Sequence, residues 1–358
     1  MRPTTVGVIG CGLIARAAHL PGLLAAHSAG LGTVVGVCDV VPEQARALAD
    51  TFGVPCFEHV DDMLERARPE VVSITTPVVN HRDLALQAFD AGCHVICEKP
   101  IAMNLAEAEE MLAGAERADR LLSICLQYRH WEESIYLRER IANGDFGSIH
   151  FVRTWGGEPH NFAIHRRHLP GGGVLSHWTI HNLDLALWLL GHPEPLTASA
   201  FCHQRLAEYP AALGSLTDGL EDPSVIASME DFGYGMVRVE NNAVISVEAD
   251  WLQPPGPRHE GWELLGAKGA ASIKPIAVQL DRDGQWLDAS PADGSLAPCD
   301  YAMDKLMIRF LQAVRCGGDA PVTATEIRRL QKLMDALYAS AACGHEVSIP
   351  PDSATSTD

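Results

Sequence analysis

The sequence predicts a two-domain α/β protein, in which a doubly wound parallel sheet is followed by an α+β domain built on a large, mostly antiparallel open sheet. The chain has 358 residues, more than one ordinary core accommodates. Apolar strand-like runs alternate with helical patterns through the first third, whereas from about Ile149 such runs follow one another directly. We therefore expect a first domain over 1–127, a second over 128–349 and a flexible tail over 350–358.

In the first domain, five apolar runs have the length and composition of buried parallel strands. They are Val6–Ile9, Val34–Cys38, Val71–Thr75, His94–Cys97 and Leu122–Cys125. The helices expected between them are Leu13–His27, Pro42–Phe52, Asn80–Ala91 and Leu105–Ala118, and a further helix follows the last strand. Gly53 and Gly92 stand where helix C-caps are expected, and Pro42 stands in a first turn.

In the second domain, strand-like runs are separated by turn-rich stretches. They are Ile149–Trp155, Pro195–Cys202, Ser224–Met229, Gly235–Glu240, Ala243–Trp251, His259–Leu265, Ala270–Ile273 and Val278–Asp281. Asn241 and Asn242 predict a tight hairpin turn. Helices are expected at 180–190 and 324–343, the second packing back toward the first domain. The far face of so large a sheet needs a cover, which favours a homodimer or homotetramer formed through it.

Charge and hydropathy exclude several classes of protein. The formal net charge of −19 leaves no basic surface for a nucleic-acid backbone. No apolar run reaches the roughly 18 residues of a bilayer span, and no signal-peptide core precedes the first strand, so we expect a cytoplasmic protein without a membrane partner. The ten cysteines include no C-x-x-C pair, and Cys38, Cys97 and Cys125 lie in apolar runs, as buried reduced thiols do.

A glycine-rich turn follows the first strand. Gly10 permits a tight turn, Gly12 lets the backbone approach a pyrophosphate, and Ala15 allows close packing of the next helix. Leu13 and Ile14, inside this Gly-x-Gly-x-x-Ala motif, are counted with the cofactor contacts. The second strand ends in Asp39, whose carboxylate can accept hydrogen bonds from the adenosine ribose and would repel a 2′-phosphate, so NAD is favoured over NADP. The structural alternative is that Asp39 only caps the following helix.

Glu98-Lys99-Pro100 stands directly after the fourth apolar run. The carboxyl ends of parallel strands line the cofactor crevice, so Lys99 is placed where a nicotinamide and its substrate meet, as a candidate proton-transfer group. Other cofactor contacts expected at this edge are Thr75, Thr76, Pro77, His81, Glu98, Lys99 and Gln127. His81 taken alone is also a polar residue of a helix start with no ligand.

Together these motifs resemble the Gfo/Idh/MocA oxidoreductase family, named for glucose-fructose oxidoreductase and inositol dehydrogenase. The matching segments are Gly10–Ala15, Thr76-Pro77 with His81, Glu98-Lys99-Pro100, Gly171–Leu175 leading to His181 and Asp184, and the tail from Tyr338 to Val347. The resemblance implies an amino-terminal Rossmann domain, an open sheet used in oligomer formation, and oxidation of pyranoses or cyclitols with a nicotinamide cofactor. It also implies that Lys99 assists proton transfer and that an Asp-x-x-x-His pair of the second domain completes the site.

The chain departs from that pattern at His177, which stands where the family has an aspartate four residues before His181. We assign Lys99 as the main acid and base, and His181 as orienter and alternative base, with Asp184 as a group that can fix a histidine tautomer. His177 completes the catalytic set. A neutral imidazole in place of a carboxylate favours a charged ammonium less, so we expect Lys99 to be more readily neutral here. The structural alternative is that His177 only packs under Trp178 and contacts no reacting group.

The sequence also predicts a set of substrate contacts from both domains. They are expected from Lys99, Arg129, Trp155, Arg166, His177, His181 and Asp184. The loop 160–168 adds further polar side chains. No metal is expected, although His177, His181 and Asp184, with His165 or His168, have the chemistry and helical spacing of zinc ligands.

The sequence thus predicts an NAD-dependent dehydrogenase or reductase that acts on a secondary hydroxyl of a sugar, glycoside or cyclitol. Two alternatives stay open at this point. One is a redox-assisted glycosidase, in which transient oxidation acidifies a neighbouring C–H bond and permits elimination. The other is a non-catalytic NAD-binding regulator, which the retained Lys99 makes less favoured.

Overall fold

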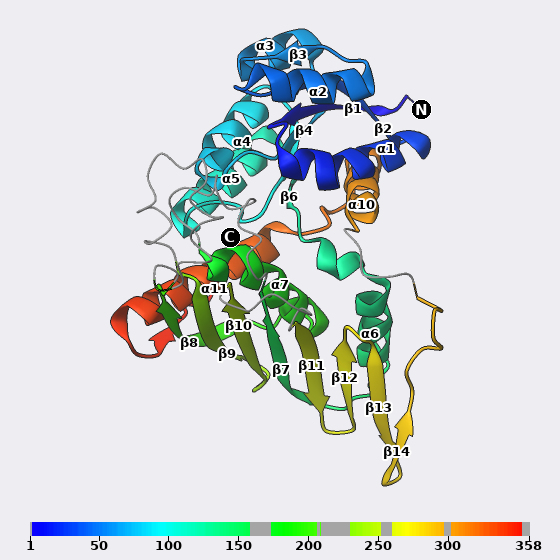
Figure 1. The fold of residues 1–358 in the computed structure, drawn as a ribbon, viewed down its shortest axis with the longest axis vertical. Coiled ribbons are helices and arrows are strands. Elements are labelled where there is room, and N and C mark those ends of the chain that lie inside the picture. Colours follow the sequence, from blue (N-terminus) through cyan, green and yellow to red (C-terminus); the bar gives the residue numbers. More distant parts are fainter. Residues whose placement is uncertain are drawn as a thin grey trace, which may run out of the picture. The chain divides into compact units, whose positions relative to one another are not determined.

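The computed structural model describes residues 2–157, 173–205, 208, 230–251, 260–296 and 302–352. The chain divides into two compact units (Figure 1). The first combines the chain up to His130 with a later segment that ends at Gln331, and the second holds the remainder. The later segment carries helix α10 (Met303–Cys316), which therefore groups with the first unit.

The first unit contains a six-stranded parallel sheet in the order β3-β2-β1-β4-β5-β6, which is the doubly wound Rossmann order. Its strands are β1 (Thr4–Ile9), β2 (Gly32–Cys38), β3 (Cys56–Phe57), β4 (Val71–Ile74), β5 (His94–Cys97) and β6 (Leu122–Ile124). The α-helices are α1 (Leu20–Ser28), α2 (Pro42–Phe52), α3 (Val60–Ala67), α4 (His81–Asp90) and α5 (Leu105–Ala118). Short helical turns lie at η1 (Ala15–His19), η2 (Val78–Asn80) and η3 (Gln127–His130). The predicted parallel sheet is confirmed.

Local sequence signals explain the sharp ends of several helices. Pro42 begins α2, and Gly53 ends it with φ of 66°, a left-handed conformation that glycine adopts without strain. Asn104 caps α5 by accepting the backbone N–H of Glu107 at 3.0 Å. The helix predicted over 13–27 is divided, since η1 is a π-helical turn that runs directly into α1.

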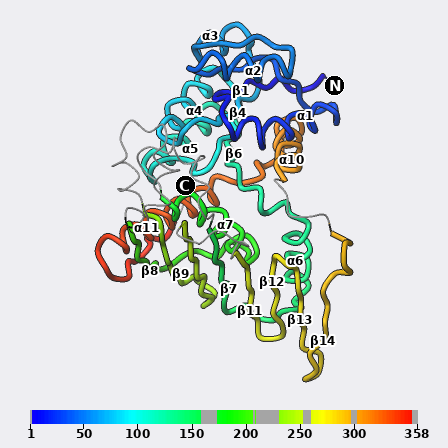
Figure 2. The backbone as a smooth tube through the Cα atoms, in the orientation of Figure 1, coloured from blue at the N-terminus to red at the C-terminus, as the bar shows by residue number. Residues whose placement is uncertain are grey.

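Helix α10 is an element that the sequence pattern did not predict. It packs beside α1 although the two are far apart in the chain, as the orange and dark blue tubes of Figure 2 show. Its apolar side, including Phe310 and Leu311, joins the core cluster that contains Val6 and Val8 of β1. The first unit is therefore completed by a segment that comes after the second sheet in the sequence.

The second unit contains a nine-stranded sheet in the order β14-β13-β12-β11-β7-β10-β9-β8-β15. Among the described strands of this sheet, only β7 and β10 pair in parallel, so the predicted, mostly antiparallel sheet is confirmed. The strands are β7 (Ile149–Gly156), β8 (Pro195–His203), β9 (Phe232–Val239), β10 (Val244–Asp250), β11 (Gly261–Gly266), β12 (Gly269–Ile273), β13 (Ala277–Arg282), β14 (Gln285–Asp288) and β15 (Val347–Ser348). The strand predicted over 224–229 lies outside the described residues.

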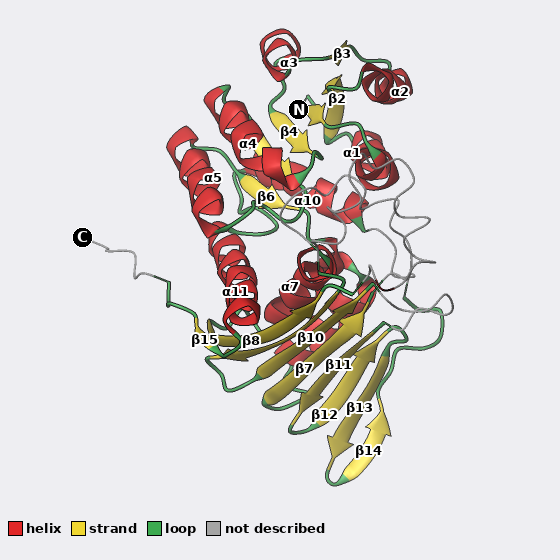
Figure 3. Cartoon of the chain, turned by 60° about the vertical axis from the view of Figure 1, so that its left-hand side comes forward, coloured by secondary structure: helices red, strands yellow, loops and turns green. Residues whose placement is uncertain are grey.

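Helices cover one face of this sheet and leave aromatic side chains on the other. Helix α6 (Glu132–Ala142) packs against α7 (Ile180–Leu189) and against β12. Helix α7 in turn packs against β10 (Figure 3). The long helix α11 (Ala324–Cys343) begins in the first unit and continues in the second. On the other face, Phe201 is 48 % exposed and stacks on Tyr234 of the neighbouring strand. The hairpin at Asn241 and Asn242 is confirmed, with Asn242 at φ of 62°.

Candidate functional site

The glycine-rich turn joins the carboxyl ends of β1, β2 and β4. Gly10 has φ of 90°, and its N–H donates to the carbonyl of Cys38 at 2.8 Å. A Cβ at Gly10 would lie 2.8 Å from the backbone of Thr75, so a larger residue would push the two strand ends apart. The Thr75 hydroxyl donates to the carbonyl of Ile9 at 3.1 Å. The turn is thus a fixed platform at the sheet edge where a dinucleotide binds in this topology.

Asp39 connects this turn to helix α2. Its carboxylate accepts the backbone N–H of Cys11 at 2.6 Å and that of Val41, the N-cap of α2, at 2.8 Å. The structural alternative considered for Asp39 is therefore present, since Asp39 does support the start of α2. A carboxylate has more acceptor positions than these two bonds use, so ribose binding and this support are compatible.

The Asp39→Asn variant is expected to weaken the preference for NAD over NADP. Asparagine keeps an acceptor oxygen for one of the two backbone donors and removes the charge that repels a 2′-phosphate, so the ratio of kcat/KM for NAD to that for NADP should fall by about tenfold. Initial rates with each dinucleotide measure this ratio. The matched control is Asp50→Asn on the exposed side of α2, which should leave the ratio unchanged. An unaltered ratio in Asp39→Asn would assign Asp39 to capping alone.

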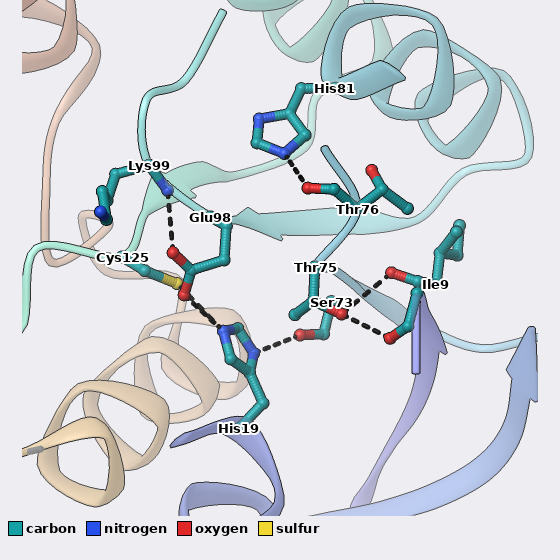
Figure 4. A network of polar contacts seen from close by, with 10 residues as sticks. Ile9, His19, Ser73, Thr75, Thr76, His81, Glu98, Lys99 and Cys125 are labelled. Atoms are coloured by element: carbon teal, nitrogen blue, oxygen red, sulfur yellow. Dashed lines mark hydrogen bonds and ion pairs between the residues drawn. The ribbon is translucent and has the colours of Figure 1, made fainter. Parts of the chain in front are cut away.

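His81 is buried between two loops of this edge. Its Nδ1 lies 2.9 Å from the carbonyl oxygen of Pro100, and its Nε2 lies 2.9 Å from that of Thr76 (Figure 4). Burial lowers the pKa of His81, and a neutral imidazole can donate to only one of these two carbonyls. The ring therefore ties the Thr76 loop to the Glu98-Lys99-Pro100 loop, which supports a positioning role.

The crevice side of this edge fits a dinucleotide. Among the described residues, Thr76 Oγ1 and Gln127 Oε1 are buried polar atoms with no hydrogen-bond partner, as expected where a ligand supplies the partner. Apolar side chains are exposed after β1, β2 and β4, where a base or nicotinamide ring would find contacts. They are Leu13 at 52 %, Val40 at 87 % and Val79 at 42 % exposure.

Glu98 lies between Lys99 and His19 (Figure 4). One carboxylate oxygen is 2.8 Å from His19 Nε2, and the other accepts the backbone N–H of Lys99 at 3.1 Å. Burial raises the pKa of Glu98, but the hydrogen bond and charge of His19 and the charge of Lys99 outweigh it, so the pKa lies below its usual value. His19 was not among the site residues predicted from the sequence. The available signal was a histidine four residues after Ala15, on the side of the helix that faces the sheet.

In the second unit, His177, His181 and Asp184 lie on one continuous helical segment. Its first part, η5 (Leu175–Thr179), is π-helical and leads into α7, so His177 and His181 are separated by about one turn. His181 and Asp184 are buried, and the ring of His177 lies 6.2 Å from that of Trp251. The predicted helix is confirmed, and all three residues belong to it.

Glu230 holds the start of this segment. Its carboxylate accepts the backbone N–H groups of Gly173 at 3.0 Å and Leu175 at 3.3 Å, and the hydroxyl of Tyr338 at 2.6 Å. The Tyr338 oxygen in turn accepts the N–H of Ser176 at 3.1 Å. A side chain at position 173 would overlap Glu230, which explains the glycine there. Sequence reasoning missed Glu230, because its partners are more than fifty positions away.

The other predicted substrate contacts are not brought together with these histidines. Trp155 lies on the uncovered face of the second sheet beside Arg153, because its neighbours Thr154 and Gly156 face the helices. Arg129, in the first unit, is buried and donates to Glu326 at 3.1 Å, which gives it a structural role there. Arg166 and the loop 160–168 lie outside the described residues.

The metal alternative on α7 gains no support from the described residues. Within them, one group of three side chains brings metal-binding atoms within 4.8 Å of one another, and it is His19, Glu98 and Cys125. His165 and His168 lie outside the described ranges. Cys38, Cys97 and Cys125 are buried free thiols, as the sequence predicted. In the described part of the chain, no helix has the length and apolarity that crossing a membrane requires.

Comparisons with known proteins cover both units. Residues 4–125 match the family described as an oxidoreductase family with an NAD-binding Rossmann fold, and residues 135–272 match the GFO/IDH/MocA C-terminal domain. The chain is 29 % identical to D-glucoside 3-dehydrogenase of Escherichia coli K12, over 97 % of this chain and 98 % of that protein. It is 32 % identical to glucose-6-phosphate 3-dehydrogenase of Bacillus subtilis, over 54 % of this chain and 55 % of that protein.

A solved structure of levoglucosan dehydrogenase with NADH and levoglucosan has the same fold, with a TM-score of 0.83 at 22 % identity, over 98 % of this chain and all of that one. The predicted NAD-binding unit, the mostly antiparallel second sheet and the family resemblance are all confirmed. The chain belongs to the Gfo/Idh/MocA oxidoreductase family and is an NAD-dependent oxidoreductase.

Proposed function

We propose that the protein transfers a hydride between NAD and a secondary hydroxyl of a sugar, glycoside or cyclitol, with a pyranose glycoside as the first substrate to test. The observation that carries this proposal is the position of Lys99, at the carboxyl end of β5 in the NAD-binding unit. The choice of glycosides is supported by the relative named D-glucoside 3-dehydrogenase, which matches over 97 % of the chain.

The proposed roles follow from what alcohol oxidation requires. NAD, when bound, accepts the hydride, and a protein group must take the hydroxyl proton as the carbonyl forms. Lys99 Nζ is proposed as that group. His181 orients the substrate and is the alternative base, while Asp184 fixes a histidine tautomer. Gly10, Gly12, Leu13, Ile14 and Asp39 hold the dinucleotide, together with the loop residues Thr75, Thr76, Pro77, Glu98 and Gln127.

The test is NADH formation against a panel of glycosides, hexoses, cyclitols and keto sugars, in both directions. The proposal expects turnover with at least one pyranose or cyclitol. A protein that binds NAD but turns over none of them would contradict it.

His177 is proposed to tune the protonation of Lys99. If His177 replaces a carboxylate near the lysine, the His177→Asp variant should move the acid limb of the pH–rate profile for sugar oxidation to higher pH, because an anion favours the charged ammonium and Lys99 must be neutral to accept the proton. The profile of kcat/KM over pH measures this limb. His203→Asp on β8 adds the same charge elsewhere in the second unit and should leave the limb in place. An unmoved limb in His177→Asp would refute this role.

We also propose that the protein is a cytoplasmic homodimer or homotetramer that associates through the uncovered face of the second sheet. Exposed aromatic and aliphatic side chains support this face as the contact. Phe201 is 48 % exposed within an aromatic group that includes Phe232 and Tyr234, and Leu265 is 38 % exposed. Apolar groups of this kind mark protein contacts more often than free surface.

A further inference from the structure

A chain of buried hydrogen bonds leads from Ser73 through His19 and Glu98 to the backbone of Lys99 (Figure 4). Ser73 Oγ lies 2.8 Å from His19 Nδ1, and His19 Nε2 lies 2.8 Å from Glu98 Oε1. Glu98 Oε2 accepts the Lys99 N–H at 3.1 Å. Ser73 and His19 are fully buried, and Glu98 is 7 % exposed. This hydrogen-bond network connects β4, η1 and the residue after β5, which lie far apart in the sequence.

The chemistry of the carboxylate fixes the direction of the central hydrogen bond. An ionised carboxylate only accepts, so His19 Nε2 must carry the proton that points at Glu98. The other ring nitrogen, Nδ1, lies 2.8 Å from the Ser73 hydroxyl. Both ring nitrogens of His19 and the Glu98 carboxylate therefore have hydrogen-bond partners, which is the condition for a stable buried network.

Glu98 is held from several sides. Its own N–H donates to the carbonyl of Ile74 at 2.9 Å, which keeps the residue in register with β4. The ionisable groups that act on Glu98 or feel its charge come from η1, β5, α4 and the segment after β6. They are His19, Cys97, Lys99, His81 and Cys125. The His19 contact of 2.8 Å is shorter than the 3.1 Å contact with the Lys99 N–H, and its side-chain hydrogen bond is the largest influence that lowers the pKa of Glu98, so His19 helps to set where the carboxylate points.

We propose that His19 is a positioning residue for Lys99: it holds the Glu98 carboxylate in the one orientation that accepts the Lys99 N–H, and so fixes the lysine relative to the glycine loop. His19 ends the π-helical turn that begins at Ala15, the last residue of the glycine motif. The same residue therefore connects the segment proposed to bind the pyrophosphate to the strand end that carries the lysine. This inference rests on the proposed catalytic role of Lys99.

The proximity of Cys125 does not make this network a metal site. The distance of 2.8 Å between His19 Nε2 and Glu98 Oε1 is that of a direct hydrogen bond, which leaves no place for an ion between the two atoms. Burial, with the nearby Glu98 charge, raises the pKa of the Cys125 thiol well above its usual value, whereas metals bind the thiolate. The geometry and the protonation of the thiol both favour the hydrogen-bond network.

Two substitutions at position 19 separate positioning from packing. In His19→Gln the amide nitrogen can replace Nε2 as donor to Glu98, whereas His19→Leu fills similar space without a donor. We expect kcat to fall by about 10²-fold in His19→Leu and by no more than about threefold in His19→Gln, because a small displacement of a catalytic group costs this much. The KM for the sugar and the Kd for NAD, from calorimetry, should change by less than about twofold.

The pH–rate profile provides a readout that packing alone would not move. Without the His19 donor the pKa of Glu98 rises and the anion beside Lys99 is weakened, so the acid limb of the profile for sugar oxidation should move to lower pH in His19→Leu but not in His19→Gln. Ser73→Ala, which keeps the fold with least disturbance, should lower kcat by a few-fold in the same way. The matched control is His94→Gln at the opposite end of β5, where His94 accepts the N–H of Leu121, and it should leave kcat and the limb unchanged.

The outcomes distinguish this inference from the proposed function. If Lys99→Ala is inactive while His19→Leu keeps the wild-type kcat and limb, the positioning role is wrong and the function stands. If His19→Leu does not fold, Ser73→Ala replaces it as the test. A wild-type kcat and pH–rate limb in Ser73→Ala would then overturn the inference. Stoichiometric zinc in the purified protein that is lost in Cys125→Ser would also overturn it, by assigning these side chains to a metal.

Discussion

The Lys99→Ala variant is expected to lose about 10²- to 10⁴-fold of kcat for oxidation of the sugar, the range that a general base contributes. Lys99 follows β5, and Glu98 and His81 fix the backbone on both sides of it through contacts to the Lys99 N–H and the Pro100 carbonyl. Truncation of the side chain removes the proton acceptor and leaves this backbone network in place. Binding of NAD, measured by calorimetry, should therefore change little.

The control for this variant is Lys268→Ala in the turn between β11 and β12 of the second unit. It removes the same charge far along the chain from the NAD-binding segments and should keep full activity. Steady-state rates at saturating NAD and sugar make the comparison. A Lys99→Ala variant that keeps more than about a tenth of the wild-type kcat would mean that another group takes the proton.

The Glu230→Ala variant is expected to destabilise the second unit by about 2–4 kcal/mol, since it leaves the N–H groups of Gly173 and Leu175 and the Tyr338 hydroxyl without their acceptor. These donors hold the start of the helical segment that carries His177 and His181. Urea unfolding followed by tryptophan fluorescence isolates the effect, because all seven tryptophans lie between Trp131 and Trp286 in the second unit.

Stability should also depend on pH through Glu230. Burial is the largest influence on its carboxyl group and raises the pKa above the usual 4.5. The folded state therefore binds the proton more tightly than the unfolded state, so the free energy of unfolding should fall as pH rises from 4.5 through the raised pKa. The Glu230→Gln variant should lack this fall. Glu263→Gln on β11, for which no comparable network exists among the described residues, should retain it; an identical pH dependence in Glu230→Gln and the wild type would contradict this account.

Much of the fold follows from local sequence signals. The bounds of α2 are set by Pro42 and Gly53, and those of α5 agree with its capping residue Asn104. The regular alternation of strand and helix patterns was enough to predict the parallel sheet. The hairpin could be predicted from its two turn residues, Asn241 and Asn242, alone. Such features depend on residues within a few positions of one another.

The features that escaped prediction depend on distant partners. Helix α10 belongs to the first unit because it packs on α1, nearly three hundred positions earlier in the chain. The role of His19 depends on its hydrogen bond with Glu98, and the role of Glu230 depends on its hydrogen bonds with Gly173 and Tyr338. Trp155 shows the effect of side-chain alternation. Its strand lies where it was predicted, but successive side chains of a strand point to opposite faces of the sheet, and Trp155 points to the uncovered face.

The most direct test of the account is the transfer of deuterium from a sugar to NAD. Wild-type protein is incubated with NAD and with methyl glucoside or inositol that carries deuterium at its ring carbons. The dinucleotide is then isolated, and its deuterium content is determined by mass spectrometry. We expect deuterated NADH with the wild type, and a rate of its formation lower by about 10²- to 10⁴-fold with Lys99→Ala. Cleavage of the glycoside without net NADH would indicate the redox-assisted glycosidase instead, and NAD that binds but gains no deuterium from any substrate of the panel would contradict the central claim.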